Sequence, residues 1–226
     1  MSSARPTFEE ALTQLNVELI KMGATVEKSI MDAVEAFKNH DEKLAKDIVA
    51  KDRIVDDMEK NIEAQCLSLI LRQQPVAGDL RVVSTALKMV TDMERIGDQA
   101  ADIVELSKYV EGSKIKNEIH LDEMSKEVIK MVTGSVDSFV SKDLYLARTV
   151  IISDDIVDNY FDDIKKKLIA LIAKTDGEGE EFIDLLMIAK YLERIGDHAT
   201  NIAFYLLDED HVERQKEKRE DRWKDF

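Results

Sequence analysis

The sequence predicts an all-α protein built from two tandem antiparallel three-helix bundles. Helix breakers are scarce, with only two prolines and eight glycines in 226 residues. Ala, Leu, Ile, Lys, Glu and Asp dominate the chain, and these residues favour helices. The motif ERIGD occurs twice, at 94–98 and at 193–197. A repeat at this distance indicates that one helical unit has been duplicated.

The two halves align along most of their length. A shift of 102 positions places DEKLAKDIVAKDRIVD, which starts at residue 41, over DLYLARTVIISDDIVD, which starts at residue 143. At the repeated motif the shift falls to 99, because Glu94 corresponds to Glu193. The second half has therefore lost three residues in the connection between its matching helices. Loops tolerate such losses, so both halves are expected to keep the same helices.

Apolar periodicity predicts three helices in each half. They lie at 7–39, 41–73 and 79–110 in the first half and at 117–140, 143–174 and 180–210 in the second. Thr7 with Glu10 has the form of a capping box, and Asp41 and Asp143 are natural N-caps. Helices of this length joined by short turns pack antiparallel. The expected domains are 1–111 and 117–207, followed by a charged tail at 208–226 that forms a solvated helical extension or a frayed end.

Composition excludes several classes of protein. The formal net charge is −15, whereas sequence-independent nucleic-acid binding requires basic patches. No apolar run is long enough to span a membrane, and the N-terminus has no apolar signal core. A single cysteine, Cys66, cannot form an internal disulfide and is expected to be a packed thiol. These features predict a cytoplasmic protein.

Each ERIGD motif places carboxylates beside a buried stripe. At about 100° per residue, Glu94 and Asp98 lie one turn apart on the same side of their helix, and Asp102 continues the row. Glu193 and Asp197 follow the same plan in the second copy. Both rows lie on the shoulder of the apolar face rather than opposite it.

The preceding helix of each half supplies matching carboxylates. Asp52 and Asp56 are one turn apart, and Asp154 and Asp158 are their counterparts. An antiparallel neighbour can bring these pairs opposite the ERIGD carboxylates, where they would repel one another unless solvent, protons, basic side chains or a cation relieved the charge. Oxygen ligands alone suit hard cations such as magnesium, calcium, manganese or ferric iron, and suit zinc less well.

A plain alternative applies to these acidic pairs, because pairs of this spacing are common on solvated helix faces. Two features argue against it. Like charges one turn apart oppose the helix, and a glycine inside a helix costs roughly 1 kcal/mol relative to alanine. The chain carries both costs twice, with Gly97 and Gly196 inside the motifs. We therefore expect these glycines to allow a neighbouring helix or an ion's shell to come close to the backbone.

The chain resembles the PhoU family of phosphate-transport accessory and regulatory proteins. The resemblance covers residues 8–207 and is carried by IVAKDRIVDDMEKNIE, LILRQQPVAGDLR, LKMVTDMERIGDQAADI and MIAKYLERIGDHATNI. It implies two three-helix bundles related by a pseudo-twofold axis. It also implies metal binding, favouring iron with manganese, magnesium, calcium or zinc as alternatives, at Glu94, Asp98, Glu193 and Asp197, helped by the four aspartates of the preceding helices and by Asp102.

The resemblance also implies partners and a role. PhoU-like proteins damp the phosphate-starvation response, acting between the phosphate ABC transporter and its sensor histidine kinase. The expected partners are therefore the ATPase subunit of that transporter, the kinase and a second copy of the chain. Contact with the membrane is expected only through these partners, and no catalysis is expected.

The two copies differ at two positions of the motif helices. Asn201 replaces Asp102, so the two sites are expected to differ in charge and affinity. His198 replaces Gln99, and we expect this histidine to face solvent or an interface rather than to bind metal.

Two other functions stay open at this point. One is a metal-buffering or storage protein, which the number of metal ions bound per chain would distinguish from a regulatory protein. The other is a carboxylate-bridged metalloenzyme, which in helical bundles uses a Glu-x-x-His pair on each of two helices. Glu193 and His198 are five residues apart, and the first motif helix has no histidine, so the sequence argues against this enzyme.

Overall fold

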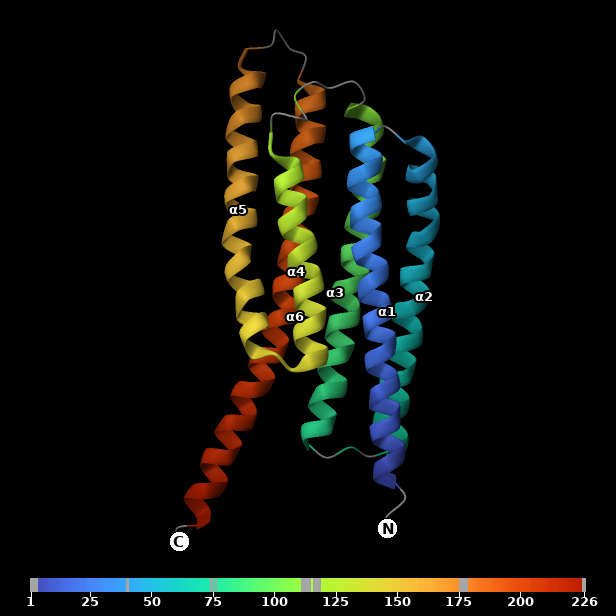
Figure 1. Ribbon diagram of the computed structural model, residues 1–226, viewed down its shortest axis with the longest axis vertical. Helices are drawn as coiled ribbons and strands as arrows, with labels where there is room; N and C mark the ends of the chain where they lie inside the picture. The colour runs from blue at the N-terminus through green and yellow to red at the C-terminus, as the bar shows by residue number, and fades with distance from the viewer. Residues whose placement is uncertain are drawn as a thin grey trace.

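A computed structural model confirms the all-α fold (Figure 1). It describes residues 4–39, 41–73, 75, 77–110, 115, 119–174 and 179–224, and these residues contain no strand. The helices are α1 (Ala4–Asn39), α2 (Glu42–Gln73), α3 (Ala77–Ser107), the 3-10 turn η1 (Lys108–Val110), α4 (Leu121–Ser141), α5 (Leu144–Ile172) and α6 (Glu180–Lys224). None of the described helices is long and apolar enough to cross a bilayer.

The helices form two bundles that lie side by side. α1, α2 and α3 pack on one another, as do α4, α5 and α6. α3 packs against α6 and α1 against α4 across the middle of the molecule. In Figure 1 each of these two pairs runs antiparallel. Equivalent helices of the two halves therefore meet at the centre, as expected for halves related by a twofold rotation.

The core follows the stripe that the sequence predicts. In α3 the fully buried residues include Met93, Ile96 and Ala100, and in α6 they include Ile195 and Ala199. Cys66 is also fully buried, which confirms the packed thiol. Burial, with the nearby charge of Glu63, raises the pKa of this thiol to about 11, so it stays protonated at neutral pH.

The helix ends agree with the predicted caps in two cases and differ in two others. The backbone N–H groups of residues 43 and 44 donate to Asp41 Oδ1 at 3.0 Å, and Asp143 accepts the equivalent pair. The capping box at Thr7 is wrong, because α1 begins at Ala4 and Thr7 lies inside it. Pro6 permits this earlier start, since a first-turn residue needs no helical N–H partner.

The second difference is the length of α6. The periodic pattern predicts an end near residue 210, but the helix continues to Lys224 and runs past the ends of its neighbours, in agreement with the helical-extension alternative for the tail (Figure 1). The sequence from 208 onward mixes both charge signs and contains no proline or glycine, so nothing in it stops the helix. Between the two predicted domains, residue 115 is the one described position of 112–116, and most of the connection before α6 also lies outside the described residues.

The motif glycines allow close packing between helices, and they do so unequally. A Cβ added at Gly97 would lie 3.1 Å from Val55 Cγ1 of α2. A Cβ added at Gly196 would meet Val157 Cγ1 of α5 at 3.5 Å, an ordinary contact. α2 therefore approaches α3 more closely than alanine would allow, whereas the α5–α6 seam has room for it.

We expect Gly97→Ala and Gly196→Ala to have different effects on stability. Alanine improves the helix by roughly 1 kcal/mol at either site. At Gly97 overpacking against Val55 costs about 1–3 kcal/mol and cancels or outweighs that gain. Gly196→Ala should raise the free energy of unfolding measured in urea, and Gly97→Ala should not. Equal effects at the two positions would contradict this account of the packing.

Candidate functional site

The seam between α2 and α3 holds the first carboxylate cluster, which we define as Asp52, Asp56, Glu94, Asp98 and Asp102. One oxygen from each of Asp52, Asp56 and Asp98 lies within 4.8 Å of the other two. Within the described part of the chain, no other group of three acidic, histidine or cysteine side chains meets this condition. The two helices therefore bring together the carboxylates that the sequence predicted would converge.

These carboxylates carry a mutual electrostatic cost. Burial raises the pKa of Asp52, and the charges of Asp98, Asp56 and Asp102 raise it further. Burial and the charge of Asp98 likewise raise the pKa values of Glu94 and Asp102. Like charges in a partly desolvated seam favour the protonated form, which indicates a place where an added cation would be stabilised.

The surroundings of Glu94 show whether the first cluster suits a metal ion. Its Oε2 atom is buried and accepts no hydrogen bond from the described residues, although Arg95 Nε lies 3.3 Å away as an ion-pair partner. Arg95 Nη1 also donates to Asp98 Oδ2 at 3.0 Å. This arginine is about half exposed and approaches one oxygen of each carboxylate. The all-oxygen donor set and the under-coordinated Glu94 atom fit a hard cation.

The second carboxylate cluster lies in the seam between α5 and α6 and consists of Asp154, Asp158, Glu193 and Asp197. Burial raises the pKa of Asp154 and the charge of Asp158 raises it further. Burial and Glu193 raise the pKa values of Asp158 and Asp197. The four predicted residues therefore share one electrostatic environment, but their oxygens do not form a three-member group of the kind seen in the first cluster.

The second cluster contains a lysine that the first lacks. Lys190 Nζ donates to both carboxylate oxygens of Glu193. The same ammonium lies 5.3 Å from the centre of the Phe161 ring. Its charge lowers the pKa values of Asp158 and Asp197, opposing the effect of burial.

A buried polar group links the two bundles beside the clusters. Asp92 of α3 is 7% exposed, and its Oδ1 atom lies 2.7 Å from His198 Nδ1 and 3.3 Å from Asn201 Nδ2, both on α6. Tyr205 also hydrogen-bonds to Asp92, and burial with the Asp92 charge raises the pKa of that tyrosine to about 12. His198 therefore lies at an interface rather than among the cluster carboxylates, as its position predicts.

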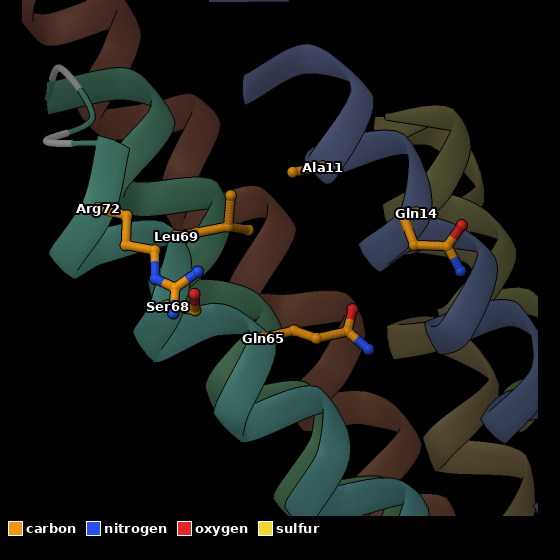
Figure 2. Close-up of a pocket in the computed structure, with 6 residues that line it drawn as sticks. All are labelled: Ala11, Gln14, Gln65, Ser68, Leu69 and Arg72. Carbon is orange, nitrogen blue, oxygen red and sulfur yellow. The ribbon is translucent and has the colours of Figure 1, made fainter. Parts of the chain in front are cut away.

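A hollow of about 320 Å³ lies apart from the clusters, between α1 and α2 (Figure 2). It is lined by Ala11, Gln14, Gln65, Ser68, Leu69 and Arg72. The lining part of α2 begins nine residues after Asp56, which is about 13 Å along the helix. None of the six described lining residues is a carboxylate, and the hollow is separate from the candidate metal site.

Comparison with known proteins identifies the family. The PhoU domain model matches residues 19–107 and 121–206. The chain belongs to the PhoU family. It is 40% identical over 200 residues to the phosphate-specific transport system accessory protein PhoU homolog of Clostridium acetobutylicum, covering 88% of this chain and 91% of that protein. It is 32% identical over 197 residues to PhoU homolog 1 of Thermotoga maritima, covering 86% and 85% of the two chains.

Solved structures of PhoU proteins share the fold. The crystal structure of PhoU from Pseudomonas aeruginosa matches with a TM-score of 0.86 and 31% identity, covering 91% of this chain and 99% of that one. The structure of the phosphate transport system regulatory protein PhoU from Streptococcus pneumoniae matches with a TM-score of 0.84 and 25% identity, covering 90% and 96%. The predicted fold and family are both confirmed.

The sequence patterns of this PhoU chain do not single out Lys190 and Phe161, which distinguish the second cluster from the first. They also do not single out Asp92, which links the two bundles. The repeat alignment contains the signal for the first two, because Lys190 corresponds to Thr91 and Phe161 to Glu59. The sequence holds no comparable signal for Asp92, whose partners lie in the other half of the chain.

We expect the metal-free PhoU chain to gain stability when Asp52 loses its charge. An acid whose pKa is higher in the folded state binds more protons when the protein is folded. Its contribution to the free energy of unfolding therefore falls as pH rises from about 4 through the folded pKa. Asp52→Asn removes this penalty and should raise the melting temperature at pH 7 in chelator. The gain should disappear below about pH 4, where Asp52 is protonated in both states.

The matched control is Asp137→Asn, because Asp137 is an exposed aspartate of α4 away from both seams. It should leave the melting temperature nearly unchanged at both pH values. A loss of stability in Asp52→Asn at pH 7 would show that this carboxylate stabilises the metal-free fold, against the direction that its surroundings indicate.

Proposed function

We propose that this chain is a regulatory accessory protein of a phosphate transport system and a negative regulator of the phosphate-starvation response. The observation that carries the proposal is the match of the PhoU domain to both bundles. Relatives that align over most of this chain are named phosphate-specific transport system accessory proteins. On this proposal the protein works by binding other proteins and not by catalysis.

The finer part of the proposal concerns partners. We infer a cytoplasmic, homodimeric adaptor that contacts the ATPase subunit of the phosphate transporter and the sensor histidine kinase. The net charge of −15 supports contact with basic partner surfaces. The absence of a described helix able to cross a bilayer is consistent with contact to the membrane through partners only.

We further propose that both carboxylate clusters bind hard cations, with iron favoured and manganese, magnesium, calcium or zinc as alternatives. The first cluster would use Asp52, Asp56 and Asp98, with Glu94 and Asp102 beside them. The second would use Asp154, Asp158, Glu193 and Asp197. A bound ion would supply positive charge that offsets the carboxylate repulsion and would hold the two helices of each seam together.

Metal buffering or storage is the second candidate function, favoured by the three converging aspartates of the first cluster. It predicts that loss of the carboxylates changes metal content but leaves phosphate signalling intact. A carboxylate-bridged enzyme is disfavoured, because His198 is hydrogen-bonded to Asp92 across the bundle interface and neither cluster, as described, contains a histidine.

The regulatory role predicts the phenotype of a deletion strain. Removing the gene should leave phosphate-starvation genes active in phosphate-rich medium, because the brake on the sensor is lost. A transcriptional reporter measures this, and the wild-type gene supplied in trans should restore repression. Unchanged reporter expression would count against the regulatory role.

The metal role predicts the behaviour of Glu94→Gln combined with Asp98→Asn. These changes keep shape and hydrogen bonding but remove two charges from the first cluster. Elemental analysis of protein saturated with iron or manganese should show about half of the wild-type metal. In the wild type, an ion present at a concentration 100 times its dissociation constant should raise the free energy of unfolding by about 2.7 kcal/mol. The increase in melting temperature should be smaller at lower pH, because protons compete with the ion for the carboxylates.

Glu123→Gln combined with Asp137→Asn is the control, because it removes two exposed charges from α4 instead. It should keep the wild-type metal content. If the cluster variant keeps it too, the first cluster is a packing and recognition feature only.

A further inference from the structure

The two carboxylate clusters have the same four central carboxylates but different surroundings. Among the aligned positions beside them that differ are Glu59 against Phe161, Thr91 against Lys190, and Asp102 against Asn201. In the first half these positions carry two negative charges and no positive one. In the second half they carry one positive charge and no negative one. At these three positions the halves therefore differ by three formal charge units.

Two further aligned positions differ in the opposite sense, because Asp155 and Asp162, whose charges raise the pKa of Asp158, stand where the first half has Arg53 and Lys60. The distinction between the clusters is therefore the direct contact of Lys190 with Glu193 and not their net charge.

The contacts made at the first three positions show this distinction. In the first half, Thr91 hydrogen-bonds to Glu59 and so keeps a further carboxylate beside the cluster. In the second half, the Lys190 ammonium hydrogen-bonds to both oxygens of Glu193, and the face of Phe161 lies beneath it. An aromatic face stabilises a cation, so Phe161 helps to hold Lys190 in place.

The first cluster also has a basic neighbour, but it leaves ligand atoms free. Among the described hydrogen bonds, Arg95 donates to Oδ2 of Asp98, and its Nε atom lies 3.3 Å from Oε2 of Glu94 without a hydrogen bond. Asp98 can still contribute to the group of three oxygens that it forms with Asp52 and Asp56. An ion that bound Glu193, in contrast, would have to displace an ammonium from both of its oxygens.

We propose that Lys190 is a built-in counter-ion of the second cluster and competes there with a metal ion. The first cluster is then the tighter of two unequal metal sites. The proposal rests on the proposed metal binding of the clusters. Lys190 occupies both oxygens of the ligand Glu193, and its charge would repel an ion at the neighbouring aspartates. The chain should then respond to metal in two steps, with the α2–α3 seam filling before the α5–α6 seam.

The test exchanges the two aligned residues in the full chain and measures Mn²⁺ binding by equilibrium dialysis. The wild type should show one tight and one weaker site, at least about tenfold apart, which is about 1.4 kcal/mol. Lys190→Thr should bring the weaker site within about threefold of the tight one. Thr91→Lys should weaken the tight site about tenfold.

Two controls accompany the exchange. Lys21→Thr removes an exposed lysine of α1, which pairs only with Glu18 among the described contacts, and it should leave both sites unchanged. Lys190→Met removes the charge while keeping the long side chain over Phe161, so it should act like Lys190→Thr even if threonine packs poorly. Far-UV circular dichroism and melting temperature show whether each variant is folded.

The outcomes separate the two proposals. Two equal wild-type sites, or a weaker site that neither Lys190 variant strengthens, would overturn the counter-ion role and leave metal binding standing. A wild type that binds no Mn²⁺ beside a Lys190 variant that binds one ion would show that Lys190 blocks the second cluster, but it would overturn the predicted tight first site and metal binding by the natural chain. No binding by any variant would overturn both.

Discussion

The close approach of α2 to α3 is the constraint on which the candidate site depends. Val55 lies against the backbone of Gly97, and on each helix the carboxylates stand three residues before and one residue after this contact. Because Asp52, Asp56 and Asp98 lie on the shoulders of the buried stripe, packing the stripe forces their charges together. Hydrophobic burial therefore holds the helices in a geometry that electrostatics alone would oppose, and the proposed cation would meet carboxylates that the fold has already brought together.

Duplication repeats this arrangement but does not preserve its charged neighbours. The second seam has the same aspartates and the same motif, yet Lys190 and Phe161 stand where the first has Thr91 and Glu59. The glycines show the same divergence, since Gly97 is crowded by Val55 and Gly196 is not. One backbone plan thus supports two sites with different charged neighbours, because substitutions at the rim of a seam leave its buried stripe untouched.

The two seams are also coupled through the centre of the molecule. Asp92 on α3 is held by His198 and Asn201 on α6, so the motif helices of the two halves share a buried polar contact. A buried carboxylate without such partners would carry a large desolvation cost. The contact therefore links α3 to α6 and gives the buried Asp92 carboxylate hydrogen-bond partners.

The sequence by itself determined the all-α class, the duplication, the buried stripes and the two sets of carboxylates that face one another. These features depend on local periodicity. Each of them occurs in both halves, because Asp52 corresponds to Asp154 and Glu94 corresponds to Glu193. The first helix's start and the length of α6 were predicted less well, because Pro6 and the charged run after 208 permit a helix without requiring a particular end.

Only the tertiary structure decided which charges meet. It joined Asp92 to His198 across 106 residues of sequence, brought three aspartates of the first cluster within 4.8 Å and placed Lys190 on Glu193 over the Phe161 ring. Helical periodicity gives the face on which a side chain lies, but not the rotation and spacing of the helix that it meets. Charge interactions depend on that spacing, so the balance of each site follows from the packing of the helices and not from their separate sequences.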